Sequence, residues 1–182
     1  SGEERLGFQW ALFAHRRFAH HDNRQLQQQQ RDLPARLHIP AAAFVTLWQA
    51  DRLRGCIGSY KADKPLYRAV MVNAIHSALQ DARFPPLQAR ELAGLDIEVS
   101  VLTPAQQIAS LDDFVLGQDG IMLEKDRHSA LYLPEAAQLY GWNREQLLQR
   151  LARKAGLPDD GWKHGARFKT FRTQSYRSAY QK

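Results

Sequence analysis

The sequence predicts an α+β protein with a mixed or antiparallel sheet and flanking helices. The proportions of apolar residues, 44%, and of charged residues, 24%, are those of a globular chain. Strand and helix patterns follow one another without a regular βαβ repeat, and no internal repeat of about 20 to 50 residues is present. At 182 residues the chain is long enough for one domain, or for two that share a core.

The first half of the chain combines helices with a hairpin. Apolar residues at helical spacing predict an amphipathic helix up to about residue 20, followed by a glutamine-rich polar segment at 23–31. Residues 42–48 and 53–60 are apolar and rich in β-branched and aromatic side chains, which predicts an antiparallel hairpin. Pro65 predicts the start of a helix with a face of small side chains, suited to close packing on a sheet. That helix must end before Pro85.

The second half predicts a long strand, a second hairpin and two helices. Residues 95–102 alternate apolar and polar side chains over a full strand, and residues 121–133 contain two short strands around a charged turn. Pro134 predicts the start of one helix. Asn143 predicts the N-cap of another, which Gly156 stops. Residues 168–180 predict a final strand.

Composition and motif content exclude several function classes. Cys56 is the only cysteine, which excludes an internal disulfide or a cluster held by several cysteines of one chain and indicates a reducing compartment, the cytoplasm. No apolar run approaches the roughly 18 residues of a membrane span, so no membrane association is expected. Histidine pairs at metal-ligand spacing, dinucleotide and Walker loops, and serine-hydrolase motifs are absent. No cofactor and no metal are therefore expected.

The net charge of +6 is concentrated at the C-terminal end. From Arg144 onward there are ten Lys and Arg against three Asp and Glu, whereas the rest of the chain has 15 against 16. Such a segment could hold phosphates or an acidic partner, but the preferred interpretation is a solvated helix face and an edge strand kept soluble by charge. Because no nucleic-acid-binding motif is present, nucleic acid is not an expected partner.

Most of the potential chemistry lies in residues 53–58, Leu-Arg-Gly-Cys-Ile-Gly, called the hexapeptide below. In an extended strand Arg54 and Cys56 point to the same side, about 6.6 Å apart along the backbone. A guanidinium at that range favours the thiolate, so Cys56 could act as a nucleophile. Gly55 and Gly58 would leave the surface open to a ligand or to another backbone. The alternative is a small core cysteine in a strand with a bulge.

An arginine in a buried strand requires a carboxylate partner, because an unpaired buried charge is too costly. Besides an acidic ligand, the candidate partners of Arg54 are Asp81, Glu98 and Glu135. Asp81 also precedes Arg83 at a helix end made rigid by prolines, which predicts a fixed salt bridge. Glu98 lies on the polar side of its strand, where it would either line a cleft or face water.

These observations define the candidate site. The candidate catalytic residues are Cys56, Arg54 and Glu98. The candidate ligand-binding residues are Arg54, Gly55, Gly58, Asp81 and Arg83. A further hypothesis pairs Cys56 with His76 and an acidic orienting residue, because His76 lies on the helix that follows the hairpin.

The hexapeptide strongly resembles the hallmark sequence of the AMMECR1 domain family, called AmmeMemoRadiSam system protein A in prokaryotes. Further agreement follows in order, at residues 44–47, 81–86, 99–102, 117–120, 133–135 and 154–157. The resemblance covers about residues 5–165. It departs from the family pattern at Ala136, where valine is expected, and in a more basic tail.

The resemblance implies one domain over residues 1–182, built from two subdomains that share a core. The smaller subdomain is expected to include about residues 35–65, packed on the larger remainder, with a cleft near the hexapeptide. The resemblance also implies a setting beside a radical-SAM protein and a Memo-like protein, which are the expected partners. This chain lacks iron–sulfur cysteines and is therefore not expected to be the radical enzyme itself.

Two functions of different classes follow from the sequence. The preferred hypothesis is a non-catalytic accessory protein that binds a radical-SAM or Memo-like partner, or a small anionic ligand, at the hexapeptide. The alternative is a small enzyme or catalytic subunit that uses Cys56 as a nucleophile or redox thiol, with Arg54 holding an anionic substrate.

Overall fold

The computed structural model describes residues 31–179 and shows an α+β protein. It contains two four-stranded antiparallel sheets with flanking helices, so the predicted fold class is confirmed. The chain divides into two compact units, and of the described residues 31–101 and 174–179 form the first and 102–173 the second. The predicted N-terminal helix and nearly all of the glutamine-rich segment lie outside the described residues.

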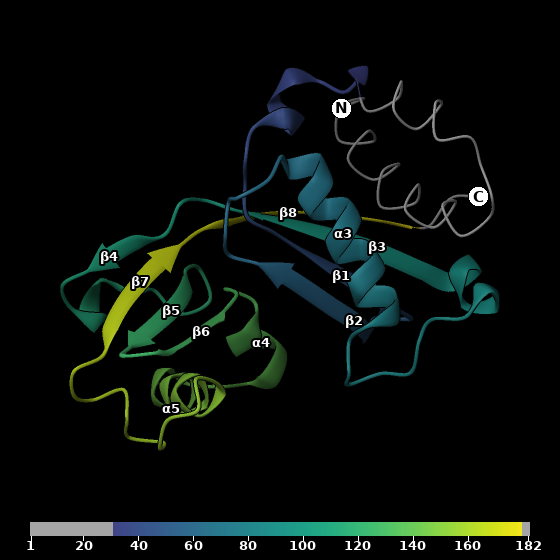
Figure 1. Cartoon of the computed structure of the whole chain (residues 1–182). Helices are drawn as coiled ribbons and strands as arrows, with labels where there is room; N and C mark the ends of the chain where they lie inside the picture. The colour runs from purple at the N-terminus through teal and green to yellow at the C-terminus, as the bar shows by residue number, and fades with distance from the viewer. Residues whose placement is uncertain (1–30, 180–182) are drawn as a thin grey trace. The chain divides into compact units, whose positions relative to one another are not determined.

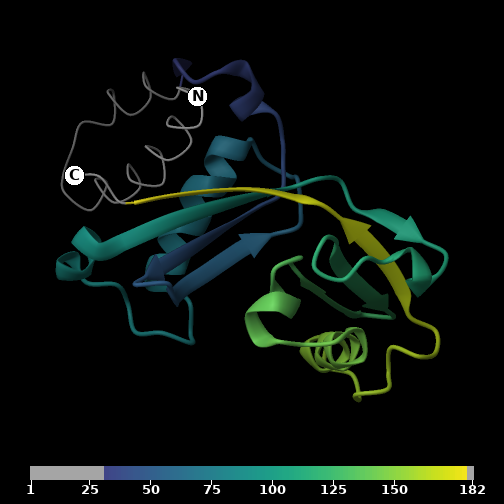
Figure 2. The same ribbon diagram turned by 180° about the vertical axis from the view of Figure 1, so that it is seen from behind.

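The first unit contains a sheet with the strand order β2-β1-β3-β8 (Figure 1). Its strands are β1 (Ala43–Gln49), β2 (Arg52–Ser59), β3 (Leu95–Leu102) and β8 (Thr173–Ala179). β1 pairs antiparallel with β2, which confirms the predicted hairpin. Ala50 and Asp51 in its turn have φ values of 47° and 59°, the left-handed conformation that two-residue hairpin turns favour. Seen from behind, β8 runs beside β3 (Figure 2).

The helix α3 (Leu66–Leu79) lies against one face of this sheet (Figure 1). It begins after Pro65 and ends before Pro85, as predicted, and its buried face carries the small residues Ala69, Asn73 and Ser77. Small side chains let the helix approach the strands closely. Between helix and sheet lies an apolar core formed by Ala43, Val45, Leu47, Val70, Ala74, Leu95, Ile97 and Val99.

Two polar side chains of α3 bond to the backbone of β1 and β2. Asn73 Nδ2 donates a hydrogen bond to the carbonyl oxygen of Ala43, at 2.9 Å. Ser77 Oγ donates to the carbonyl oxygen of Val45, at 2.7 Å, and accepts from the amide of Ile57, at 2.8 Å. Because Val45 and Ile57 are cross-strand partners, the hydroxyl bridges the two strands. Both side chains are buried and hydrogen-bonded, and they fix the position of α3 along the sheet.

The second unit contains a sheet with the strand order β4-β7-β5-β6. Its strands are β4 (Gln106–Ile108), β5 (Gly120–Lys125), β6 (His128–Tyr132) and β7 (Arg167–Phe171), and its helices are α4 (Ala136–Tyr140) and α5 (Arg144–Lys154). The β5–β6 hairpin is confirmed. Asn143 caps α5 by accepting from the amide of Gln146, and Gly156 follows the helix with φ 80°, so both predicted helix ends are also confirmed.

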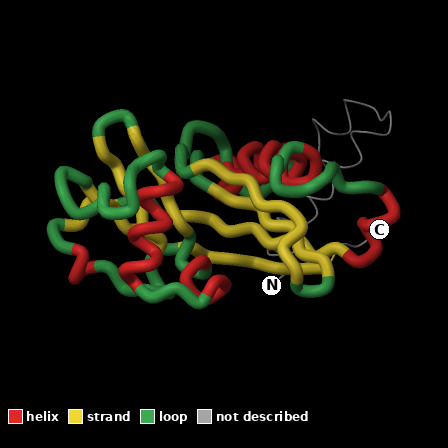
Figure 3. The backbone as a smooth tube through the Cα atoms, turned by 90° about the horizontal axis from the view of Figure 1, so that it is seen from below, coloured by secondary structure: helices red, strands yellow, loops and turns green. Residues whose placement is uncertain are grey.

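The core of the second unit lies between α5 and its sheet. It is formed by Phe114, Ile121, Leu123, Leu147, Leu148, Leu151, Ala155 and Phe168. Short 3-10 turns connect other elements along the chain: η1 (Ala35–His38), η2 (Ala89–Gly94) and η3 (Leu111–Asp113). Figure 3 shows the helices in red, the strands in yellow and the connecting loops in green.

The C-terminal segment departs from the prediction. The sequence predicts one strand over residues 168–180, and the structure has two, β7 and β8, which belong to different sheets. At the junction Thr103 and Arg172 are joined twice: the Thr103 amide donates to the Arg172 carbonyl, and the Arg172 amide donates to Thr103 Oγ1. Residues 35–65, for which a smaller subdomain is predicted, lie in the first unit together with α3 and most of β3.

The close approach of α3 to β2 gives a direct test. A β-carbon on Gly55 would lie 2.2 Å from the carbonyl oxygen of Ser77, whereas one on Gly94 would have nothing within 4 Å. We expect Gly55→Ala to lower the free energy of unfolding by about 2–3 kcal/mol, because helix backbone cannot yield as a side chain can. The matched control Gly94→Ala should change it by less than about 0.5 kcal/mol. Urea denaturation of both variants measures the difference, and equal midpoints would contradict the packing described.

Candidate functional site

The hexapeptide lies in β2, at the edge of the first sheet. Leu47 pairs with Gly55 and Trp48 pairs with Leu53, so Arg54 is the extra residue of a β-bulge. The alternation that would place Arg54 and Cys56 on one side is therefore interrupted between them. A bulge of this kind changes the direction in which the Arg54 side chain leaves the strand.

The Arg54 side chain is bound by a carboxylate of its own chain. Its Nε lies 2.8 Å from Glu91 Oε1 and its Nη2 lies 3.1 Å from Glu91 Oε2, a two-bond pair in which the Arg54 side chain is only 11% exposed. The hydrogen bond from Arg54, with a second from the Gln88 amide, lowers the pKa of Glu91. The expected partners Asp81, Glu98 and Glu135 are thus wrong, and Arg54 is neutralised by Glu91.

Asp81 and Arg83 together bind the peptide groups of Cys56. Asp81 Oδ2 accepts from the Cys56 amide at 2.9 Å, and Arg83 Nη2 donates to the Cys56 carbonyl oxygen at 3.2 Å. Arg83 Nη2 also lies 2.7 Å from Asp81 Oδ2, so the predicted salt bridge is confirmed. The Asp81–Arg83 pair therefore hydrogen-bonds to the amide and carbonyl groups of an edge strand, as a neighbouring strand would do.

The two glycines of the hexapeptide are covered by the protein itself. The α-carbon of Gly55 faces the backbone of Ser77 on α3, and that of Gly58 faces the ring of Phe44 on β1. The surface that the sequence predicts to be open at these positions is therefore occupied by a helix and a phenyl ring. Glycine is needed at residue 55 because a β-carbon would not fit against the α3 backbone.

Cys56 lies in a row of three polar side chains that crosses the sheet. Cys56 pairs with Thr46 in β1, and Thr46 pairs with Glu98 in β3. Thr46 Oγ1 donates to Cys56 Sγ at 3.2 Å. Thr46 is buried, whereas Cys56 and Glu98 are half-buried. The sequence thus brings Cys56 and Glu98 to the same face, with a hydroxyl between them.

This row faces away from α3. Val45 and Leu47, the neighbours of Thr46 in β1, pack against α3, so Thr46 and its cross-strand partners point to the opposite side of the sheet. His76 belongs to α3. The hypothesis of a Cys56–His76 pair is therefore wrong, because the thiol and the imidazole lie on opposite faces.

The family model described as AMMECR1 matches residues 11–176, which is most of the chain. The chain belongs to the AMMECR1 family. It is 40% identical to a protein of Thermococcus gammatolerans and 39% identical to protein TK0174 of Thermococcus kodakarensis, each over 141 residues that cover 72% of this chain and 69% of the relative. The predicted family resemblance is thus confirmed.

A solved structure supports the same assignment. The fold is similar to that of the uncharacterized protein PH0010 from Pyrococcus horikoshii, with a TM-score of 0.77 and 36% identity over 82% of this chain and 79% of that chain. The names of these AMMECR1 relatives state no activity. Family membership therefore determines the fold and leaves the reaction, if there is one, to be argued from the site.

Many cations of the basic C-terminal segment are paired with acids of this AMMECR1 protein itself. Such pairs are Arg153–Asp159, Lys169–Glu124, Arg172–Asp119, Arg177–Asp96 and Arg177–Asp51. β8 is at the edge of its sheet and β7 is not. The ion pairs thus give part of the basic segment a structural role, whereas the sequence predicts a solvated helix face and an edge strand kept soluble by charge.

Within 31–179, no group of three or more His, Cys, Asp or Glu side chains is arranged to hold a metal ion. The helices of the same region are too short or too polar to cross a bilayer.

Glu91 and Thr46 are the site residues that sequence reasoning missed. Glu91 shares a capping box with Gln88 at the start of η2. A glutamine followed three residues later by a glutamate is a weak form of that signal, because Ser, Thr, Asp and Asn are the favoured caps. Thr46 carries no signal beyond its place in a β-branched strand, so only the register of β1 on β2 and β3 reveals it.

The Asp81 carboxylate gives an acid dependence that can be measured. The hydrogen bond from the Arg83 side chain, with those from the amides of Cys56 and Arg83, lowers the pKa of Asp81 from 3.8 to about 2. Because the folded-state pKa lies below the unfolded value, its stabilisation of about 2 kcal/mol is present above about pH 4 and is lost as pH falls through 2. We expect Asp81→Asn to lower the free energy of unfolding at pH 7 by at least that amount, and by less at pH 2.

The comparison is made by denaturant unfolding of both proteins at several pH values from 7 to 2. Asp126→Asn, at an exposed turn, is the control, and it should lack this pH-dependent difference. A difference between wild type and Asp81→Asn that stays constant with pH would show that the carboxylate charge does not contribute.

Proposed function

We propose that this AMMECR1 protein is a non-catalytic accessory protein that binds a partner of a radical-SAM and Memo-like system. Binding uses the face of the first sheet that carries Cys56 and Glu98. The identity of the partners comes from the family resemblance. The surface comes from the register of β2, β1 and β3, which aligns Cys56, Thr46 and Glu98 on the side away from α3.

The observation that supports a binding role is that the charged and backbone groups of the hexapeptide have partners within the chain. Arg54 is neutralised by Glu91, the Cys56 peptide groups are bound by Asp81 and Arg83, and α3 packs onto Gly55. Groups held in this way shape and stiffen a surface. They do not present an acid, a base and a nucleophile to a substrate.

The same contacts favour a protein over a small anion as the bound species. An anion at Arg54 would have to displace Glu91 from a two-bond ion pair that is largely withdrawn from water. An anion at Arg83 would meet the carboxylate of Asp81, 2.7 Å from the guanidinium. Binding of an anion at either arginine is unfavourable. At Arg54 it would break an ion pair, and at Arg83 it would bring two negative charges together.

Copurification tests the proposal. The chain is coexpressed with tagged Memo-like and radical-SAM proteins of its own source, and retention is measured for wild type, Glu98→Lys and the charge-matched control Glu145→Lys on α5. We expect wild type and Glu145→Lys to be retained and Glu98→Lys to be reduced at least fivefold, because the reversed charge lies in the binding face. Absence of wild-type retention by both tagged proteins would overturn the proposal, and equal retention of all three forms would remove this face from it.

A second candidate function rests on Cys56, which is half-buried and whose sulfur accepts a hydrogen bond from the Thr46 hydroxyl. In that case the protein would be an enzyme or catalytic subunit with a reactive thiol. Because Cys56 is the only cysteine, alkylation reports on it alone.

Iodoacetamide labelling at pH 7 separates the two functions. For an accessory protein we expect Cys56 of the folded protein to be labelled at least about tenfold more slowly than in urea, since the fold partly covers this residue. Labelling of the folded protein that is faster than in urea would instead support the catalytic alternative. Mass spectrometry at timed intervals gives both rates.

A further inference from the structure

A pocket of about 320 Å³ lies within the second unit, apart from the hexapeptide. It is formed where residues 107–111, which include the end of β4, face residues 162–168, which lead into β7. Its volume is at the lower end of the roughly 300–1,000 Å³ typical of small-molecule sites. All of its lining residues belong to one compact unit.

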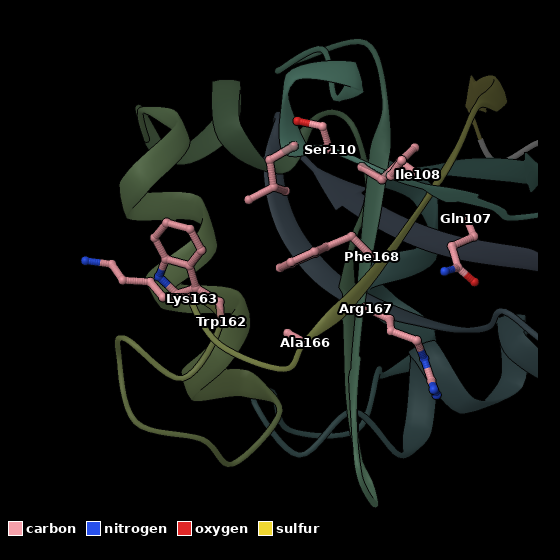
Figure 4. Close-up of a pocket in the computed structure, with 10 residues that line it drawn as sticks. Gln107, Ile108, Ser110, Trp162, Lys163, Ala166, Arg167 and Phe168 are labelled. Carbon is pink, nitrogen blue, oxygen red and sulfur yellow. The ribbon is translucent and has the colours of Figure 1, made fainter.

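Polar and apolar groups both line the pocket, with the polar share somewhat the larger, and the apolar part includes two aromatic residues. Figure 4 shows the indole of Trp162 and the ring of Phe168 on two sides of the hollow, with Ser110 and Ala166 at its ends. The Nε1 atom of Trp162 is buried and has no hydrogen-bond acceptor within the described structure.

The charges around the pocket are positive. Its lining residues include Lys163 and Arg167 and no acid, and Figure 4 shows these two side chains pointing outward from the hollow in different directions. Among the described residues Lys163 has no ion pair, and its Nζ lies 5.5 Å over the Trp162 ring. Arg167 lies 3.9 Å from Glu124, but Glu124 holds Lys169 more closely, at 2.8 Å. Neither rim cation is therefore firmly neutralised.

We propose that this pocket binds a small, flat, apolar carboxylate. The ring system would lie between Trp162 and Phe168, where aromatic contact adds to the burial of apolar surface. The carboxylate would lie at the rim, within reach of Lys163 or Arg167. Both side chains are exposed and long enough to turn toward a bound anion. This site is independent of the surface proposed for partner binding, so either proposal can fail without the other.

The test uses 2-naphthoate as the probe and 2-naphthamide and inorganic phosphate as comparisons. The indole N–H signal of Trp162 is assigned by its loss in Trp162→Phe, and its shift is followed by nuclear magnetic resonance during titration of the full chain. We expect 2-naphthoate to move this signal with a Kd below about 1 mM and 2-naphthamide to bind about tenfold more weakly. Phosphate should not produce the same shift, since it lacks the apolar body.

Variants identify the charges. Lys163→Gln and Arg167→Gln should each weaken 2-naphthoate binding about threefold to fivefold, as expected for an exposed ion pair, and the double variant about tenfold. Arg153→Gln removes an equal charge from α5, away from the pocket lining, and should leave binding unchanged. All three positions are exposed, so the variants should fold.

Several results would overturn the proposal. They are no shift of the Trp162 signal with 2-naphthoate, equal affinity for the amide and the acid, an equal shift with phosphate, or an affinity that both Gln variants leave unchanged.

Discussion

The first unit depends on the close approach of α3 to the β1–β2 hairpin. Ser77 stands at the centre of this contact, because its hydroxyl bridges the backbones of Val45 and Ile57 while its own carbonyl lies against Gly55. One turn earlier, Asn73 bonds to the backbone of Ala43. These bonds are directional and buried, so they specify one position of the helix on the sheet where apolar packing alone would allow several. The strand surface on the far side is held in place as a result.

The same constraint changes the meaning of the hexapeptide. Its arginine, two glycines and cysteine suggest a reactive site when they are considered as a list of residue types. In the structure each has a partner within the chain: Arg54 binds Glu91, Gly55 lies against α3, Gly58 lies against Phe44, and the peptide of Cys56 is held by Asp81 and Arg83. The Cys56 side chain points to the face of the sheet opposite α3, where it lies next to Thr46. Residue types that suggest catalysis can thus serve to hold one edge strand in place.

Local signals in the sequence were sufficient for most of the fold. The period-two pattern of residues 95–102, the polar turn at 49–52 and the caps at Asn143 and Gly156 act within one element, so they could be recognised without the rest of the chain. The division of residues 168–180 between two sheets could not, because no glycine or proline marks Arg172 and the break is determined by bonds to Thr103.

The candidate site was less predictable for the same physical reason. Asp81 and Arg83 lie two positions apart in the sequence, so their pairing could be predicted from the sequence. The Arg54–Glu91 pair joins residues 37 apart, and the β-bulge that directs Arg54 depends on how β2 meets β1. The row of Cys56, Thr46 and Glu98 requires three strands in register. Long-range pairings of this kind depend on the register of the strands in the sheet, and the local pattern of the sequence does not specify that register.

The second unit is inserted between two parts of the first, since the chain leaves at Val101 and returns at Gln174. This has a consequence for synthesis on the ribosome. β7 completes the second sheet and β8, which begins two positions after β7 ends, completes the first, so both sheets wait for the same C-terminal segment. The hydrogen-bonding edge of β3 stays open until the last strand emerges. A premature stop near residue 173 would therefore release a protein in which the second sheet is complete and β3 is an unpaired edge strand. Such an aggregation-prone form would have to be removed by chaperones or proteases.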